Sequence, residues 1–123
     1  MRKSILLTVV ILFMGMGLSA QQGSLLESIG KNDLSGLKKA MKDQIEFCIN
    51  DGQQNIQKDK ALELISAFLK DVDPRSCRKV HLGDSKQKGS YYEVGKLKTA
   101  KGNYRVFIYY ENNQVVEFRI DNY

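Results

Sequence analysis

The chain has 123 residues, of which 42% are hydrophobic and 27% charged, with a formal net charge of +5. This composition is typical of a globular protein and excludes a disordered, collagen-like or disulfide-rich chain, and the length allows one domain. No motif combines aromatic and basic residues as nucleic-acid-binding domains do, so we expect no nucleic-acid partner. A solvated strand face explains the densest lysines, and an anionic partner such as lipid headgroups or surface polysaccharide is the alternative. These lysines are Lys86, Lys88, Lys96, Lys98 and Lys101.

The first 20 residues have the pattern of a secretory signal peptide. Met1-Arg2-Lys3 is a positive start, and the apolar run over residues 5–18 is too short to span a bilayer comfortably. Leu18-Ser19-Ala20 then offers small residues at a cleavage point. We therefore predict cleavage near Ala20, export to the periplasm or the medium, no stable membrane span, and one folded domain over residues 21–123.

The next part of the chain has apolar residues at helical spacing. A short amphipathic segment over residues 25–29 ends at Gly30, and Asp33 can cap a second helix. That helix has one apolar face, formed by Leu34, Leu37 and Met41. A half-buried strand follows over residues 45–49 and ends at Asp51-Gly52.

The clearest helix has Asp59 near its N-terminus and is closed by Asp73-Pro74. Its apolar residues recur at helical spacing, at Ala61, Leu64, Ile65, Phe68 and Leu69. We expect Ile65 and Phe68 to face the sheet that follows, at Val94, Val106, Ile108 and Phe118.

From Cys77 onward the pattern is that of an antiparallel meander. Val80 and Leu82 mark the first strand, and a polar turn spans residues 85–89. The central strand, residues 104–110, is apolar on both faces, and a tight turn at residues 112–113 leads to a last strand over residues 116–120.

The strand between these two begins with Tyr92 and Val94 on one face, but Leu97 and Thr99 continue the apolar set one residue late. Because Gly95 lies where the alternation slips, we predict a β-bulge there that bends the sheet over the long helix. The elements together predict an α+β cone, in which a curved antiparallel sheet wraps around the long helix and leaves a cavity at its open end.

Several segments in this order carry a family resemblance: Ile29-Gly30-Lys31-Asn32-Asp33, Lys58-Asp59-Lys60-Ala61, Phe68, Pro74, His81-Leu82-Gly83-Asp84-Ser85, Tyr92-Glu93-Val94-Gly95-Lys96-Leu97 and Gly102-Asn103-Tyr104-Arg105-Val106. Through them the chain resembles the nuclear-transport-factor-2-like superfamily. More narrowly, it is similar to an uncharacterised family of exported bacterial proteins, of the domain of unknown function 4783 type. The resemblance implies a fold and export, and it brings no assigned reaction.

Catalytic residues are not predicted. His81 is the one histidine, and a strand histidine hydrogen-bonded to a neighbouring element is favoured over a general acid or base. Glu93, Glu117 and Asp121 alternate opposite the apolar set, so we expect no carboxylate inside the cone with a raised pKa. The catalytic sets of similar enzymes, such as steroid isomerases and scytalone-type dehydratases, therefore do not transfer. Strand tyrosines remain as a source of a hydroxyl, at Tyr91, Tyr92, Tyr104, Tyr109 and Tyr110.

We expect a ligand pocket inside the cone, with no cofactor and no metal, because one histidine and two cysteines at unrelated spacing match no zinc pattern. The candidate lining residues are Phe68, His81, Tyr92, Val94, Tyr104 and Tyr110.

Cys48 and Cys77 both alternate toward the less apolar sheet face, so a disulfide is possible if their strands are neighbours. Such a bridge would add about 3–4 kcal/mol, and two half-buried thiols are the alternative. On the central strand, Phe107 and Tyr109 make the outer face apolar as well. That face packs against the chain's own helices or forms a homodimer.

Two functions are compatible with these observations. The first is a non-catalytic cell-envelope module that binds a small apolar ligand or an envelope protein in or around the cone. The second is a cone-pocket isomerase, dehydratase or hydrolase that uses His81 or a tyrosine. A shielded carboxylate inside the cone would favour the second.

Overall fold

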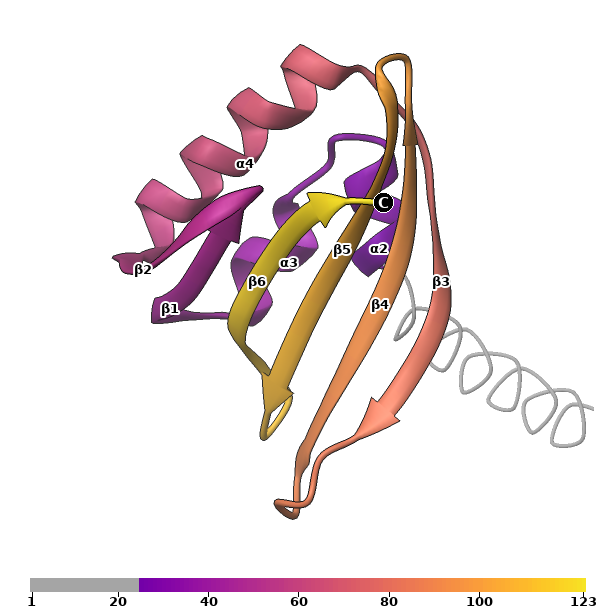
Figure 1. The fold of residues 1–123 in the computed structure, drawn as a ribbon. Coiled ribbons are helices and arrows are strands. Elements are labelled where there is room, and N and C mark those ends of the chain that lie inside the picture. Colours follow the sequence, from indigo (N-terminus) through magenta and orange to yellow (C-terminus); the bar gives the residue numbers. More distant parts are fainter. Residues whose placement is uncertain (1–24) are drawn as a thin grey trace, which may run out of the picture.

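The computed structural model describes residues 25–123, so the predicted signal peptide and cleavage site lie outside the described residues. The elements of the described part run in the order α2–α3–β1–β2–α4–β3–β4–β5–β6 (Figure 1). The helices are α2 (Leu25–Gly30), α3 (Ser35–Ala40) and α4 (Lys58–Val72). The strands are β1 (Met41–Ile49), β2 (Asp51–Gln57), β3 (Pro74–Asp84), β4 (Ser90–Thr99), β5 (Gly102–Glu111) and β6 (Gln114–Asn122).

The short helices follow the predicted pattern except at the end of α3. Asp33 holds the start of that helix, because its Oδ1 accepts hydrogen bonds from Ser35 Oγ at 2.8 Å and from Ser35 N at 3.1 Å. These two bonds lower the pKa of Asp33. Met41 was expected on the helix, but the helix ends at Ala40 and Met41 begins β1, where it pairs with Val115 of β6.

The strands form one sheet in the order β2-β1-β6-β5-β4-β3. Neighbouring strands are antiparallel except for β1 and β6, which are parallel. β2 was not predicted because Ile56 is its one apolar side chain, so the strand shows no alternation. It forms because the chain reverses after β1 at Asn50, whose φ of 65° suits a tight turn.

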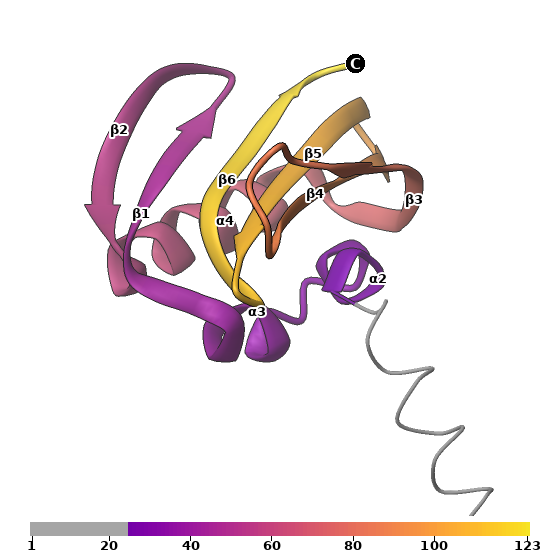
Figure 2. The ribbon, with the colours of Figure 1, turned by 90° about the horizontal axis from the view of Figure 1, so that it is seen from below.

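The sheet curves around the helices, which lie on its concave side (Figure 2). α4 packs on β1 and β2, and α2 packs on β3. Ile65 of α4 is fully buried as predicted, whereas Phe68 is only partly buried at the edge of the core. The concave strand face supplies the other large core residues, among them Phe47, Leu97, Val106, Ile108, Phe118 and Ile120. The α+β cone is therefore confirmed.

β4 keeps one continuous alternation, so the predicted bulge at Gly95 is wrong. The β4–β5 register is unbroken along the whole strand. The nearby register shift lies on β3, between Lys79 and His81. Gly95 is needed for close packing instead, because a Cβ there would lie 2.9 Å from Leu26 Cδ2 and 3.0 Å from Cys77 Sγ.

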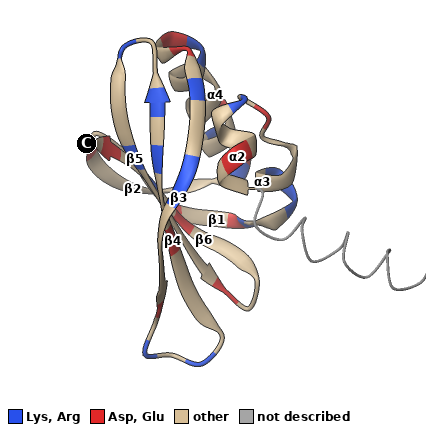
Figure 3. Ribbon diagram, turned by 90° about the vertical axis from the view of Figure 1, so that its right-hand side faces the viewer, with Lys and Arg blue, Asp and Glu red and all other residues tan. Residues whose placement is uncertain are grey.

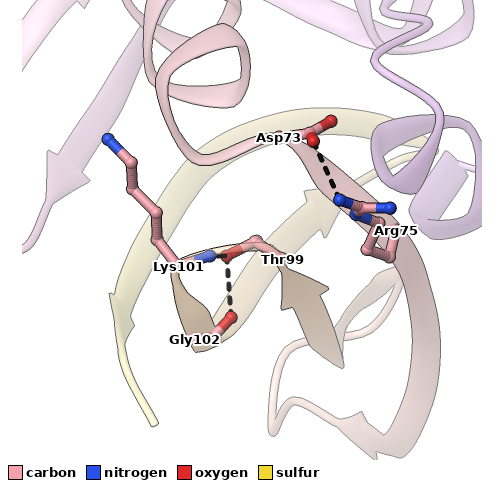
Figure 4. A network of polar contacts seen from close by, with 5 residues as sticks. All are labelled: Asp73, Arg75, Thr99, Lys101 and Gly102. Carbon is pink, nitrogen blue, oxygen red and sulfur yellow. Dashed lines mark hydrogen bonds and ion pairs between the residues drawn. The ribbon is translucent and has the colours of Figure 1, made fainter.

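The turn after α4 lies beside the hairpin between β4 and β5 (Figure 4). Asp73 ends the helix with a φ of 57°, and its carboxylate accepts a hydrogen bond from Arg75 Nη2 at 3.1 Å. In the hairpin, Thr99 Oγ1 donates to the Gly102 carbonyl at 2.8 Å and accepts from Lys101 N at 3.0 Å. The Lys101 ammonium also forms a 3.1 Å ion pair with an aspartate of α4, which ties the hairpin to the helix.

Candidate functional site

Three of the predicted pocket residues lie on the concave side, but at two separate places. Phe68 and Tyr104 meet edge to face where α4 approaches β5, with ring centroids 5.1 Å apart. Tyr110 lies at the other end of β5, near the β5–β6 turn, and is 4% exposed. The three residues therefore do not line one pocket.

The other three, Tyr92, Val94 and His81, lie on the convex face, contrary to the prediction. The unbroken alternation of β4 turns Tyr92 and Val94 away from the core, and β3 carries His81 beside them. His81 Nε2 lies 3.3 Å from Tyr92 Oη, and the Tyr92 ring stacks on Phe107 with centroids 5.4 Å apart. His81 is thus an exposed strand histidine bonded to the neighbouring strand, outside the cone.

Glu93 is the site residue that the sequence analysis missed. It was placed opposite the apolar set, yet it lies on the concave face and is only 6% exposed. Its cross-strand neighbours are Leu82 on β3 and Ile108 on β5. The sequence does hold a signal for it. Strand side chains alternate between faces, so counting back in steps of two from Leu97 places residues 95, 93 and 91 on the same face as Leu97.

A buried carboxylate is costly unless polar groups compensate it. Lys79 Nζ lies 3.8 Å from Glu93 Oε2, from the neighbouring strand. Tyr110 is the second partner. Burial raises the pKa of Tyr110, and the charge of the Glu93 carboxylate and a hydrogen bond to it raise this pKa further. The phenol therefore remains protonated at neutral pH, so its hydroxyl can donate to the Glu93 carboxylate.

A second tyrosine extends this cluster toward solvent. The Tyr91 ring stacks on the Tyr110 ring, with centroids 4.5 Å apart and planes 11° from parallel. Burial raises the pKa of Tyr91, and the charge of Glu93 adds to the effect. We name Tyr91, Glu93 and Tyr110 the Glu93 cluster.

A hollow of about 430 Å³ adjoins the Glu93 cluster. It lies at the end of the sheet that holds the β3–β4 and β5–β6 turns, which extends beyond the helices (Figure 1). Its lining residues are Leu82, Asp84, Gly89, Ser90, Tyr91, Asn112 and Asn113. Because Tyr91 belongs to both, the hollow and the cluster form one candidate site, with a volume in the range of small-molecule sites.

A second hollow of about 460 Å³ lies between α3 and α4. Leu34 and Leu62 are among its lining residues, together with the exposed side chains of Lys38, Asp59 and Glu63. None of these charged groups is shielded from water, so this hollow lacks the buried polar group that distinguishes the Glu93 cluster.

Cys48 and Cys77 are free thiols, as in the second of the two alternatives, and both are buried rather than half-buried. Three strands separate β1 from β3 in the sheet, so the two thiols lie far beyond bonding distance. Cys77 also faces the core rather than the polar face, beside Gly95, and burial raises its pKa to about 12. It is a packing residue.

Within residues 25–123, no three His, Cys, Asp or Glu side chains come together where they could hold a metal ion. Across the same residues, the helices are too short or too polar to cross a bilayer.

The concave sheet and its covering helices define a nuclear-transport-factor-2-like α+β fold, and comparisons with solved structures agree. A design described as "Rd1NTF2_04 with long sheet" has a TM-score of 0.64 at 12% identity, covering 80% of this chain and 94% of its own. A putative isomerase from Bacillus subtilis has a TM-score of 0.61 at 10% identity, covering 83% and 84%.

The chain belongs to DUF4783, a domain of unknown function whose family model matches residues 23–122. A DUF4783 family protein from Bacteroides ovatus ATCC 8483 is similar in structure, with a TM-score of 0.72 at 23% identity, covering 81% of this chain and 93% of its own. At these identities the structural likenesses show the fold alone. No curated protein matches the sequence.

Proposed function

We propose that this protein is an exported, non-catalytic module of the cell envelope that binds a small amphipathic ligand at one end of its cone. This end, which holds the β3–β4 and β5–β6 turns, is called the hairpin end below. The observation that carries the proposal is the buried carboxylate of Glu93, which lies next to the stacked pair Tyr91 and Tyr110 beside an open hollow. The basic start and short apolar run of residues 1–20 support export.

The chemistry of the hollow suggests the kind of ligand. Leu82 is 56% exposed beside Tyr91, so an apolar body can gain contact area there. Glu93 and Asp84 bring two carboxylates to this end of the cone, and Lys79 is the ammonium that faces Glu93. A ligand with an apolar chain and a terminal amine or other hydrogen-bond donor matches both features.

Octylamine and octanoate, which have the same apolar chain and opposite charge, test this preference. We expect octylamine to bind at least about tenfold more tightly than octanoate. The carboxylates of the site attract the ammonium group of octylamine and repel the carboxylate of octanoate. NMR titration of labelled protein should place the largest shifts at Leu82, Tyr91 and Glu93.

Two matched variants locate the effect. Glu93→Gln should remove the preference for the amine, whereas Glu27→Gln, on the exposed surface of α2, should leave it unchanged. Equal binding of the two probes, or the same loss in both variants, would contradict the proposal.

The Glu93 cluster also favours a second function, a cone-pocket enzyme in which Glu93 replaces His81 as the acid–base group. A shielded carboxylate with a phenol donor is an arrangement that proton-transfer enzymes use, and the fold is shared with the putative isomerase from Bacillus subtilis. Native mass spectrometry of protein incubated with an envelope extract separates the two functions. A retained compound that stays chemically unchanged supports binding, and a product formed by wild type but not by Glu93→Gln supports catalysis.

We also propose a second copy of the chain as the partner of the convex aromatic residues. Phe107, Tyr92 and Tyr109 are half-buried against one another and their strand neighbours, and the described helices lie on the other side of the sheet. Light scattering after size exclusion should show a dimer that Phe107→Ser converts to a monomer.

A further inference from the structure

Four basic side chains form a cluster on the convex face, near the β4–β5 turn and away from the β3–β4 and β5–β6 turns. Arg78 of β3 pairs in register with Lys96 of β4, and Lys96 pairs with Arg105 of β5. Lys98 lies two residues beyond Lys96 on the same face and pairs with Ser76. Figure 3 shows basic stretches on neighbouring strands in this part of the sheet. We name Arg78, Lys96, Lys98 and Arg105 the basic cluster.

Like charges directly opposite each other on neighbouring strands destabilise a sheet, so this arrangement has a cost in stability. Other cations of the described chain have a counter-ion: Lys58, Lys79 and Arg119 each have a carboxylate within 4.0 Å. No residue of the basic cluster takes part in an ion pair within residues 25–123. Arg105 is opposite Asp121 in the β5–β6 register, yet the two do not approach within that limit.

An aromatic ring takes the position that a counter-ion would otherwise occupy. Lys96 Nζ lies 4.9 Å from the centroid of the Tyr123 ring, and Arg105 Cζ lies 5.3 Å from it. A ring face attracts cations without neutralising them, so the basic cluster keeps its full positive charge.

The basic cluster is also hollowed. Ser76, Arg78, Lys96 and Lys98 line a depression of about 250 Å³. This volume is below that of sites for drug-sized molecules, so it suits a small group. Neighbouring strands are spaced about 4.8 Å apart, which lets cations of two strands reach the same oxyanion. The Ser76 hydroxyl adds a neutral donor.

We propose that the basic cluster binds a phosphate group, either as a free phosphate or as the headgroup of an anionic lipid. Three observations point to this chemistry: the cations lie opposite one another across strands, none of the four forms an ion pair with a carboxylate of residues 25–123, and the cluster is hollowed. The site lies on the opposite sheet face from the Glu93 cluster and does not depend on its function.

Two probes distinguish the sources of the phosphate. The first is inorganic phosphate, titrated by NMR at constant ionic strength maintained with sodium chloride. The second is sedimentation with vesicles of phosphatidylglycerol and phosphatidylcholine, compared with vesicles of phosphatidylcholine alone. Saturable phosphate shifts at Arg78, Lys96 and Lys98 indicate a free-anion site. Vesicle binding that requires phosphatidylglycerol, without phosphate shifts, indicates a headgroup site. Either result supports the proposal if it is lost in the variant described next.

The decisive variant is Arg78→Gln with Lys96→Gln, which should weaken binding at least about tenfold because two charge-assisted contacts are lost. The control is Lys39→Gln with Lys42→Gln, which removes the same charge from exposed positions at the end of α3 and the start of β1. It should change binding by no more than about twofold, the size of a non-specific charge effect.

A thermal melt keeps the test independent of folding. Because the cluster variant relieves like-charge repulsion, it should melt at the same temperature as wild type or higher. Absence of binding to both probes, or equal loss in the control variant, would overturn the proposal. It would also be overturned if the cluster variant dissociates a dimer while phosphate has no effect, because a second copy of the chain would then be the occupant.

Discussion

The two ends of the concave face differ in what they bury. Where α2 and α4 cover the sheet, the side chains are apolar and close-packed, and a Cβ added at Gly95 would already press on Leu26. At the hairpin end, no described helix covers the strands, Leu82 is exposed, and Glu93 holds a carboxylate out of water (Figure 1). The covered end gives the domain most of its stability. The hairpin end holds the polar groups of the Glu93 cluster, which packing of the core does not require. Substitutions should therefore have very different effects at the two ends.

The largest difference is expected between Ile65 and Leu82. Ile65→Ala removes a fully buried side chain of α4 and should lower the free energy of unfolding by about 4 kcal/mol. Leu82→Ala truncates an apolar residue that is 56% exposed at the hairpin end and should change it by less than about 0.5 kcal/mol. Urea unfolding followed by circular dichroism measures both. Similar losses in the two variants would mean that the hairpin end is part of the core.

Gly30 tests how tightly α2 is seated on the sheet. A Cβ at Gly30 would fall on the Cys77 backbone nitrogen, and backbone cannot move aside as a side chain can. Gly30→Ala should therefore cost about 3 kcal/mol, although alanine favours helices. The control is Gly36→Ala on α3, where the new methyl meets only the end of the Leu25 side chain. It should be neutral or stabilising, and a Gly30→Ala protein as stable as this control would show that α2 is loosely packed.

The sequence predicted the covered end of the molecule better than the open end. Apolar periodicity found α4 and its buried Ile65, because a long amphipathic helix repeats its signal over several turns. β2 gave no such signal, since pairing with β1 rather than a hydrophobic pattern makes it a strand.

On β4 the face was assigned the wrong way round. Tyr92 and Val94 are together more apolar than Tyr91 and Glu93, so hydrophobicity favoured placing Tyr92 and Val94 on the core face. Leu97 also faces the core, and only a bulge at Gly95 could put all three on one face. The structure reverses the assignment because the fold buries a carboxylate, which is rare for a glutamate unless it has partners. Those partners come from β3 and β5, and cross-strand register is not readable from one sequence.

Replacing Glu93 separates stability from polar chemistry at the hairpin end. Glu93→Gln removes the buried charge but leaves an oxygen that can accept a hydrogen bond from Tyr110. The variant loses the attraction between Glu93 and Lys79, but it also avoids the cost of removing a carboxylate from water. Because these two effects oppose each other, the free energy of unfolding should change by about 1 kcal/mol or less. Thermal and urea unfolding of the variant measure this change. A loss as large as that of Ile65→Ala would place Glu93 in the structural core of the domain.

The smallest effect is expected for Glu117, on the convex side of β6. Burial raises the pKa of Glu117, and Glu46, its cross-strand neighbour on β1, raises it further, while Arg119 opposes both effects. The folded state therefore holds the proton more tightly than the unfolded state, and stability falls as pH rises from the unfolded pKa through the folded one. Glu117→Gln should stabilise the domain by about 0.5 kcal/mol near pH 7, the usual size of an unfavourable cross-strand charge pair. Near about pH 3 the carboxyl is protonated in both states, and the gain should disappear. Urea unfolding of wild type and variant at the two pH values checks the sign. A variant less stable than wild type at neutral pH would show that the contact with Arg119 outweighs burial, and that the convex face, unlike the hairpin end, carries its carboxylate without cost.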